Sequence, residues 1–149
     1  FDVGHGAGTF IFPVAADSMK DNFPPDTISS DLHQASILKT KPAMPNVISK
    51  FLNFGMSLQD AIYKSTVRPA KAISKFPEIG TLSEGKVADI GVFKLRHGVF
   101  GFNDANRRRM IGTKRLEAVL TVRDGEVVFD RDGLGYPEWH TAGDYGVIP

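Results

Sequence analysis

Apolar and polar residues follow two different patterns along this chain, and the change between them predicts two kinds of structure. Up to about residue 76, apolar residues often recur every three or four positions, as they do on one face of a helix. From about residue 80, the apolar runs are short and rich in β-branched residues, which is typical of strands. We therefore predict an α/β part over residues 1–76, a β part over 77–133 and a C-terminal tail over 134–149.

The beginning of the chain predicts one strand–helix–strand unit. A strand ends in the glycine-rich loop of residues 4–8, and a helix starts near Pro13, because proline suits the first helical position. The helix ends before the pair Pro24–Pro25, which cannot continue its hydrogen bonds, and residues 27–30 form a second strand. Units of this kind build parallel sheets, so we expect the two strands to run in the same direction.

The middle of the chain predicts a loop followed by helices. Residues 34–44 are typical of an irregular loop, and a helix then runs from Pro45 to about Phe54, with Gly55 as its stop. Ser57 caps the next helix. We expect that helix to break before Pro69, where a short helix restarts, because the residue before a proline disfavours helical geometry.

The β part carries a strong hairpin signal. Residues 86–93 and 116–122 predict strands, and the second leads through Asp124–Gly125 into the β-branched run 126–129. Asp-Gly between two such runs favours a two-residue turn, because a type I′ turn needs a positive φ at both positions.

Composition excludes several classes of protein. Eighteen Lys and Arg against 17 Asp and Glu leave a charge of +1, which gives no electrostatic reason to expect nucleic acid or a membrane surface as partner. The chain has no Cys, which excludes disulfides and cysteine metal sites and agrees with a cytoplasmic location. No apolar run approaches the ~18 residues that a membrane span needs. Because the first residue is Phe1 and not Met, we expect a piece of a longer chain.

Three side chains at the strand ends could carry chemistry: His5, Asp31 and His33. In α/β proteins, ligands bind at the carboxyl ends of the strands. A carboxylate there can hold a cation or act as a general base, and the glycines around Gly6 let the backbone approach a ligand. Each residue also has a structural interpretation, Asp31 as a turn or cap residue and His5 as a hydrogen-bond partner of a loop carbonyl.

Five stretches, in a fixed order, carry a recognisable pattern. They are Phe1–Gly8, Asp26–His33, Ser49–Met56, Ser65–Ala70 and Gly80–Ile90. Together they resemble the C-terminal part of metal-dependent amidohydrolases, in particular the dihydroorotase-like amidohydrolase/deacetylase family.

The resemblance implies the last strands and helices of a (β/α)8 TIM barrel, followed by part of a small β-sandwich domain. It also implies one or two divalent metal ions, usually zinc, held by a His-x-His on strand 1, a carboxylated lysine on strand 4 and histidines on strands 5 and 6. An aspartate on strand 8 binds one metal and takes the proton of the attacking water, and Asp31 matches that position. His5 then falls on strand 7, because one helix separates it from Asp31. We expect His5, Gly6 and His33 to bind the substrate, with His5 alternatively supporting the site from behind.

The chain also departs from the family. It contains no His-x-His, and a complete barrel needs about 200–250 residues, so barrel strands 1–6 are missing and we expect this chain alone to be inactive. The implied activity is hydrolysis of an amide, or an acyl ester, of a small acylated or cyclic substrate through metal-activated water, in a homo-oligomer. Two alternatives stay open: a non-catalytic relative that acts as a scaffold or oligomerisation protein, and an independent α/β binding module.

Overall fold

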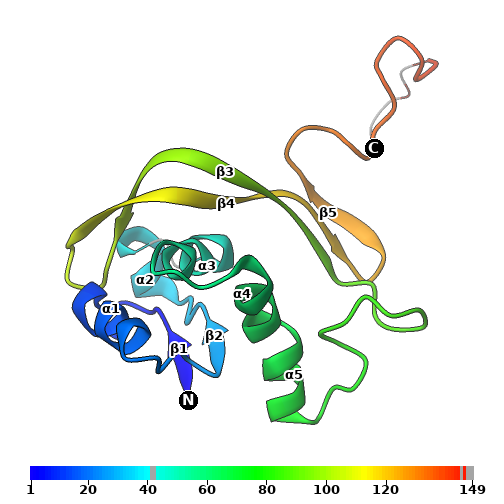
Figure 1. Cartoon of the computed structure of the whole chain (residues 1–149). Helices are drawn as coiled ribbons and strands as arrows, with labels where there is room; N and C mark the ends of the chain where they lie inside the picture. Colours follow the sequence, from blue (N-terminus) through cyan, green and yellow to red (C-terminus); the bar gives the residue numbers. More distant parts are fainter. Residues whose placement is uncertain (41–42, 145, 147–149) are drawn as a thin grey trace.

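In the computed structural model, which describes residues 1–40, 43–144 and 146, two small sheets lie on either side of a group of helices. The elements are β1 (Asp2–Gly4), α1 (Phe12–Lys20), β2 (Thr27–Ser29), α2 (Gln34–Lys39), α3 (Met44–Asn53), α4 (Leu58–Ser65), α5 (Val67–Ile73), β3 (Ile90–Asn103), β4 (Arg109–Arg123) and β5 (Glu126–Asp130). Figure 1 shows the long β3–β4 hairpin arching over the helices, with β1, β2 and α1 below them.

The predicted strand–helix–strand unit is confirmed. Strands β1 and β2 pair in parallel, with Asp2 opposite Thr27 and Gly4 opposite Ser29, and α1 connects them. Helix α1 begins at Phe12, whose backbone N–H donates to the Asp104 carboxylate over 3.2 Å. The β3–β4 turn, which contains Asp104, therefore helps to fix the start of α1.

The prediction of an irregular loop over residues 34–44 is wrong for residues 34–39, which form α2. The Ser36 hydroxyl accepts a hydrogen bond from the His33 N–H (3.0 Å) and donates one to the His33 carbonyl (2.9 Å). The first of these hydrogen bonds satisfies the His33 N–H, a donor that the start of a helix leaves without an intrahelical partner. Residues 41–42 of the predicted loop lie outside the described residues.

The predicted helices around Gly55 are confirmed, and one boundary is corrected. Gly55 has a φ of +97° after α3, and the Ser57 hydroxyl accepts from the Asp60 N–H at the start of α4. The break expected before Pro69 falls earlier, at Thr66, where φ is −130° and ψ is −80°. Pro69 lies in the first turn of α5, where its missing N–H is not needed.

The β part forms an antiparallel sheet in the order β3–β4–β5. The predicted start of its first strand at residue 86 is wrong, because β3 begins at Ile90, and both hairpin strands are longer than predicted. Most of β3 is exposed, so its sequence lacks the apolar alternation of a half-buried strand, and pairing with β4 carries it to Asn103. The turn at Asp124–Gly125 is confirmed, with φ values of +49° and +84°.

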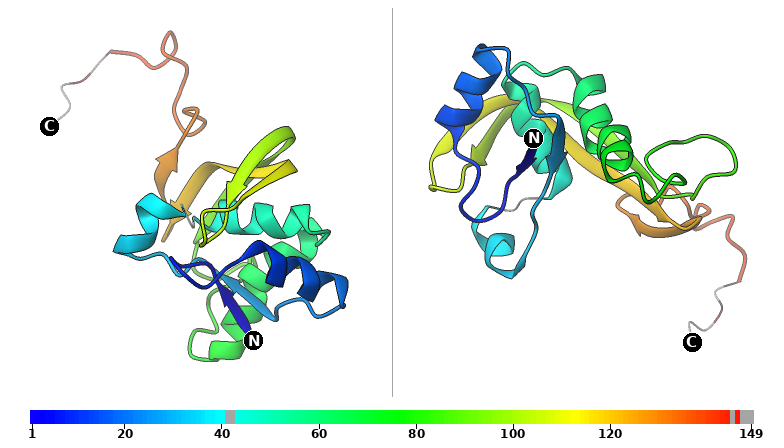
Figure 2. Two further views of the ribbon diagram at one scale, coloured as in Figure 1. Left: turned by 90° about the vertical axis from the view of Figure 1, so that its left-hand side faces the viewer. Right: turned by 90° about the horizontal axis from the view of Figure 1, so that it is seen from below.

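One hydrophobic cluster joins both sheets to the helices. The buried face of α3 supplies four of its members, each at most 3% exposed: Val47, Ile48, Phe51 and Leu52. Ile28 of β2 and Leu116 of β4 complete the cluster from opposite sides, and Figure 2 shows α3 between the two sheets.

The division into parts at residues 76 and 133 stays a prediction. Of the predicted tail over 134–149, residues 145 and 147–149 lie outside the described residues. Within the described ranges, no helix combines the length and hydropathy needed to cross a bilayer.

Candidate functional site

The carboxyl ends of β1 and β2 bring three of the predicted site residues together. His5 directly follows β1, and Asp31 comes two residues after β2. The Gly6 N–H donates to the Ser30 carbonyl over 3.3 Å and ties the two loops to each other. His5, Gly6 and Asp31 therefore meet at one edge of the parallel pair.

Asp31 is exposed and lies against the Gly6 backbone. Its φ of +46° is in the left-handed region, which aspartate tolerates better than most residues. A Cβ built on Gly6 would lie 2.3 Å from the Asp31 Oδ2, so the carboxylate occupies the space that any side chain at position 6 would need. Gly6 itself has a φ of +39°. The backbone conformation favours glycine here, and a side chain at position 6 would displace the Asp31 carboxylate.

His5 is fully buried beneath this edge. Its Nδ1 lies 3.2 Å from the Gly6 carbonyl oxygen, and its Nε2 contacts the Lys50 Nζ. The ring stacks on Phe10, with the ring centroids 4.8 Å apart. Burial, followed by the neighbouring Lys50 charge, lowers the pKa of His5 below 6.5. The ring is therefore neutral at pH 7, and its predicted contact with substrate stays a prediction.

His33 is exposed at the start of α2, two residues beyond Asp31. Its predicted role in binding substrate also stays a prediction. Helix α2 also places Thr40, the residue that follows it, in a buried position near Gly6, where it is 4% exposed. The Thr40 hydroxyl donates to the Gly6 carbonyl over 3.0 Å. Because residues 34–44 were predicted to be an irregular loop, the hydrogen bond from Thr40 to Gly6 was not expected.

Lys50 is the main residue that the sequence analysis missed. It is fully buried, its ammonium contacts the His5 Nε2, and it donates to the Asn103 carbonyl over 2.7 Å. Burial lowers the pKa of Lys50 to about 8, against an opposing effect of the Asp104 charge. The available signal was its position three residues after Val47, which places a lysine on the apolar face of α3.

Two further polar side chains of α3 fix the hairpin above the site. Asn53 accepts hydrogen bonds from the backbone N–H groups of Thr113 (2.8 Å) and Lys114 (3.1 Å) and donates to the Lys114 carbonyl (2.7 Å). The Ser49 hydroxyl accepts from the Leu116 N–H over 2.8 Å. These contacts lie beside a break in the β3–β4 register, where backbone groups lose their regular partners.

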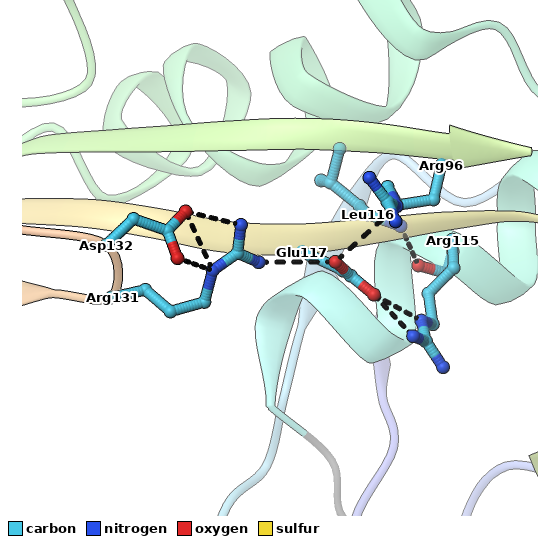
Figure 3. A network of polar contacts seen from close by, with 7 residues as sticks. Arg96, Arg115, Leu116, Glu117, Arg131 and Asp132 are labelled. Carbon is cyan, nitrogen blue, oxygen red and sulfur yellow. Dashed lines mark hydrogen bonds and ion pairs between the residues drawn. The ribbon is translucent and has the colours of Figure 1, made fainter.

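The outer face of the sheet carries a separate charged network, shown in Figure 3. Glu117 accepts hydrogen bonds from Arg115 and Arg131, and Arg96 lies 3.9 Å from its carboxylate. The Arg115 hydrogen bonds, aided by the nearby arginine charges, lower the pKa of Glu117. The network contains none of the predicted site residues.

The structure also contains an apolar cleft of about 630 Å³ away from the strand ends. Residues of α4, α5, the following loop and β3 line it, among them Ile62, Pro69, Ile79, Leu82 and Phe93. None of the predicted site residues belongs to its lining. Over the described ranges, no group of three or more His, Asp or Glu side chains is placed to hold a metal ion.

Comparisons with known proteins find relatives over most of the chain. Residues 13–128 match the amidohydrolase family. A deacetylase from Brucella anthropi is 32% identical over 70% of this chain, and a deacetylase from Enterococcus faecalis is 25% identical over 85%. The chain spans only 26% and 34% of the lengths of these two proteins.

Two solved structures share the fold. An adenine deaminase superposes with a TM-score of 0.78 at 24% identity, over 88% of this chain and 35% of the deaminase. A dihydroorotase superposes with a TM-score of 0.76 at 28% identity, over 85% of this chain and 34% of the dihydroorotase. Since the family match covers most of the chain, from α1 into β5 and including Asp31, the chain belongs to the amidohydrolase family.

Proposed function

We propose that the whole protein that carries these residues is a metal-dependent hydrolase that cleaves a C–N bond, or an acyl ester, of a small acylated or cyclic substrate. In this proposal, residues 1–76 are the C-terminal portion of a (β/α)8 barrel and residues 77–133 are strands of a β-sandwich. The parallel β1–β2 pair with its crossover helix supports the first assignment, and the deacetylase relatives support the reaction. The exposed Asp31 carboxylate at the carboxyl edge of that pair carries the proposal.

Asp31 fits one ligand position of a divalent metal site. Carboxylate oxygen is a ligand that zinc accepts, and Asp31 is exposed at a strand end beside a residue without a side chain. We assign the other ligands to parts of the protein outside this chain. A bound divalent ion, zinc in this proposal, lowers the pKa of a water molecule and polarises the substrate carbonyl.

The residues of this chain then handle protons and position the substrate. Asp31 accepts a proton from the attacking water and delivers it to the leaving nitrogen or oxygen, as a general base and then a general acid. Gly6 and His33 flank the substrate in this proposal, on either side of Asp31. Of the two roles expected for His5, burial favours support of the Gly6 loop over direct contact. The proposal also includes a homo-oligomer and a small-molecule substrate, with neither nucleic acid nor a membrane as partner.

Elemental analysis and turnover of the purified whole protein test this function. We expect one or two zinc ions per chain and hydrolysis within a panel of N-acetyl amino acids, acyl esters and cyclic amides. The 149-residue chain alone is the matched comparison, and we expect neither zinc nor turnover from it. A whole protein without metal or turnover would favour the scaffold alternative, whereas stoichiometric zinc in the isolated chain would contradict a site shared with other parts of the protein.

A further inference from the structure

A continuous path of polar contacts connects the β3–β4 hairpin to the loop beside Asp31. It starts at the Asn103 carbonyl, which accepts from the Lys50 ammonium over 2.7 Å. The same ammonium contacts the His5 Nε2, and the His5 Nδ1 lies 3.2 Å from the Gly6 carbonyl oxygen. Gly6 lies next to the Asp31 carboxylate, since a Cβ added to it would come within 2.3 Å of the Asp31 Oδ2. Lys50 and His5 are both fully buried, so water does not compete for these contacts.

The lysine and the Gly6 carbonyl act together on which nitrogen of His5 carries the proton. An ammonium group has three donors and no acceptor, so the His5 Nε2 must accept from it. A neutral imidazole has one donor and one acceptor, which leaves Nδ1 as the N–H group. That N–H donates to the Gly6 carbonyl. Without a donor at position 50, only the Gly6 carbonyl would favour the Nδ1–H form, so the Nε2–H form, whose Nδ1 lone pair faces the carbonyl, would become more populated.

Hydrogen bonds to its carbonyl and from its N–H hold Gly6 beside Asp31. The Gly6 carbonyl accepts from both His5 and Thr40, and the Gly6 N–H donates to the Ser30 carbonyl. These contacts hold Gly6 in its left-handed conformation, with its Cα against the Asp31 Oδ2. A small rotation of this peptide would move the surface on which the carboxylate rests.

We propose that Lys50 is a positioning residue for the reaction at Asp31: it holds His5 in the Nδ1–H form, and His5 fixes the Gly6 peptide that supports the carboxylate. This inference rests on the proposed function of Asp31. Lys50 touches no reacting atom and acts only through His5 and Gly6. The β3–β4 hairpin, through Asn103, thereby becomes part of the support of the site.

Nitrogen NMR of the whole protein with ¹⁵N-labelled histidine tests the first step without any activity measurement. We expect His5 at pH 7 as a neutral ring protonated at Nδ1, and we expect Lys50→Met to weaken this preference and raise the share of the Nε2–H form. Assignment of the signal uses the spectrum of His5→Gln. A wild-type His5 protonated at Nε2 would overturn the proposal, and this measurement does not depend on the folding of any Lys50 variant.

Steady-state kinetics of the whole protein test the second step. We expect Lys50→Met to lower kcat about ten- to a hundred-fold, with KM and metal content unchanged, because small displacements of a catalytic group have effects of this size. Because Lys50 acts through His5, the double variant Lys50→Met/His5→Gln should lose no more kcat than the more impaired single variant. Lys64→Met is the matched control, because Lys64 also donates to a backbone carbonyl, that of Pro25, but does not contact His5.

The kinetic results can overturn either the positioning role of Lys50 or the function of Asp31. Additive losses in the double variant, or a Lys50→Met enzyme with wild-type kcat, would overturn the positioning role. Asp31→Asn, measured in the same series, separates the two proposals. If Asp31→Asn keeps wild-type kcat, the function proposed for Asp31 fails, whereas an Nδ1–H signal that weakens in Lys50→Met would still establish the contact between Lys50 and His5.

Discussion

The two strand ends at the edge of the β1–β2 pair carry ionisable side chains in opposite surroundings. His5, after β1, is fully buried, and both of its ring nitrogens lie next to protein groups. Asp31, after β2, is exposed and held in a left-handed backbone conformation. The two residues are linked through Gly6, whose carbonyl faces His5 and whose Cα faces Asp31.

This difference shows that a place at the carboxyl end of a strand does not by itself define a role. A buried ring with both nitrogens engaged is suited to hold a loop, because its hydrogen bonds are already made. An exposed carboxylate can exchange protons and accept a cation.

Replacing Asp31 by Asn in the whole protein should have the largest effect. Asn keeps the shape and one carbonyl oxygen but cannot take a proton, so we expect kcat to fall by ~10²–10⁴-fold or more while KM changes little. Steady-state kinetics and metal content measure both effects. Asp17→Asn, at an exposed position on α1, should behave like the wild type. If the two variants are equally active, Asp31 is not the proton-transfer group.

Gly6→Ala tests the link between the two strand ends. The new Cβ would lie 2.3 Å from the Asp31 Oδ2, and alanine would have to adopt a φ of +39°, which strains an L residue. We therefore expect at least a ten-fold loss of kcat and a lower Tm. Gly55→Ala is the control, because Gly55 also has a positive φ but nothing lies within 4 Å of its added Cβ. Equal losses of kcat in both variants would attribute the effect to backbone strain and not to Asp31.

The pH dependence of stability tests the burial of His5. Its pKa is lowered in the folded state, so the unfolded chain binds a proton first as the pH falls below 6.5. The contribution of His5 to the free energy of unfolding is therefore complete above pH 6.5 and is lost as the pH falls toward the folded-state pKa. The Lys50 charge opposes protonation of the ring, and Asp104 acts on Lys50 from the β3–β4 turn.

We expect the wild-type Tm to decrease between pH 7 and pH 5 more steeply than the Tm of His5→Gln, which cannot titrate at this position. Thermal denaturation across this range measures the two slopes. Identical slopes would show that His5 takes up its proton equally well in the folded and unfolded states. The prediction that His5 is a buried, neutral ring in the folded state would then be wrong.

The sequence predicted the fold well where the signal was local. The Gly55 stop, the Ser57 cap and the Asp124–Gly125 turn act within a few residues, and the structure confirms them. The two errors had different causes, one a local cap that the prediction overlooked and one a long-range pairing. The start of α2 depends on the Ser36 exchange with His33, and β3 extends through exposed residues because β4 pairs with it.

The site was predictable only in part for a related reason. Parallel pairing brings successive strand ends together, so His5, Gly6 and Asp31 could be placed at one edge from the order of elements alone. The contacts that support them join residues 45 and 34 positions apart, between Lys50 and His5 and between Thr40 and Gly6. No short motif in the sequence encodes such contacts, although a lysine within an apolar helix face signals a buried partner.

Glu117→Gln should have the smallest effect on stability. It shows how much an ion pair contributes to Tm when the charged group is not fully buried. Glu117 is paired like His5 but only partly buried, with 22% of its side chain exposed, in the network of Figure 3. Water and salt screen such pairs, so we expect Tm to change by at most about 2 °C at low salt and not at all in 0.5 M NaCl. Thermal denaturation at the two salt concentrations measures this, with Lys50→Met as the buried comparison, whose Tm shift should not depend on salt. A salt-independent loss of more than 5 °C in Glu117→Gln would show that pairing alone, without burial, is enough to make a charged group structurally important in this fold.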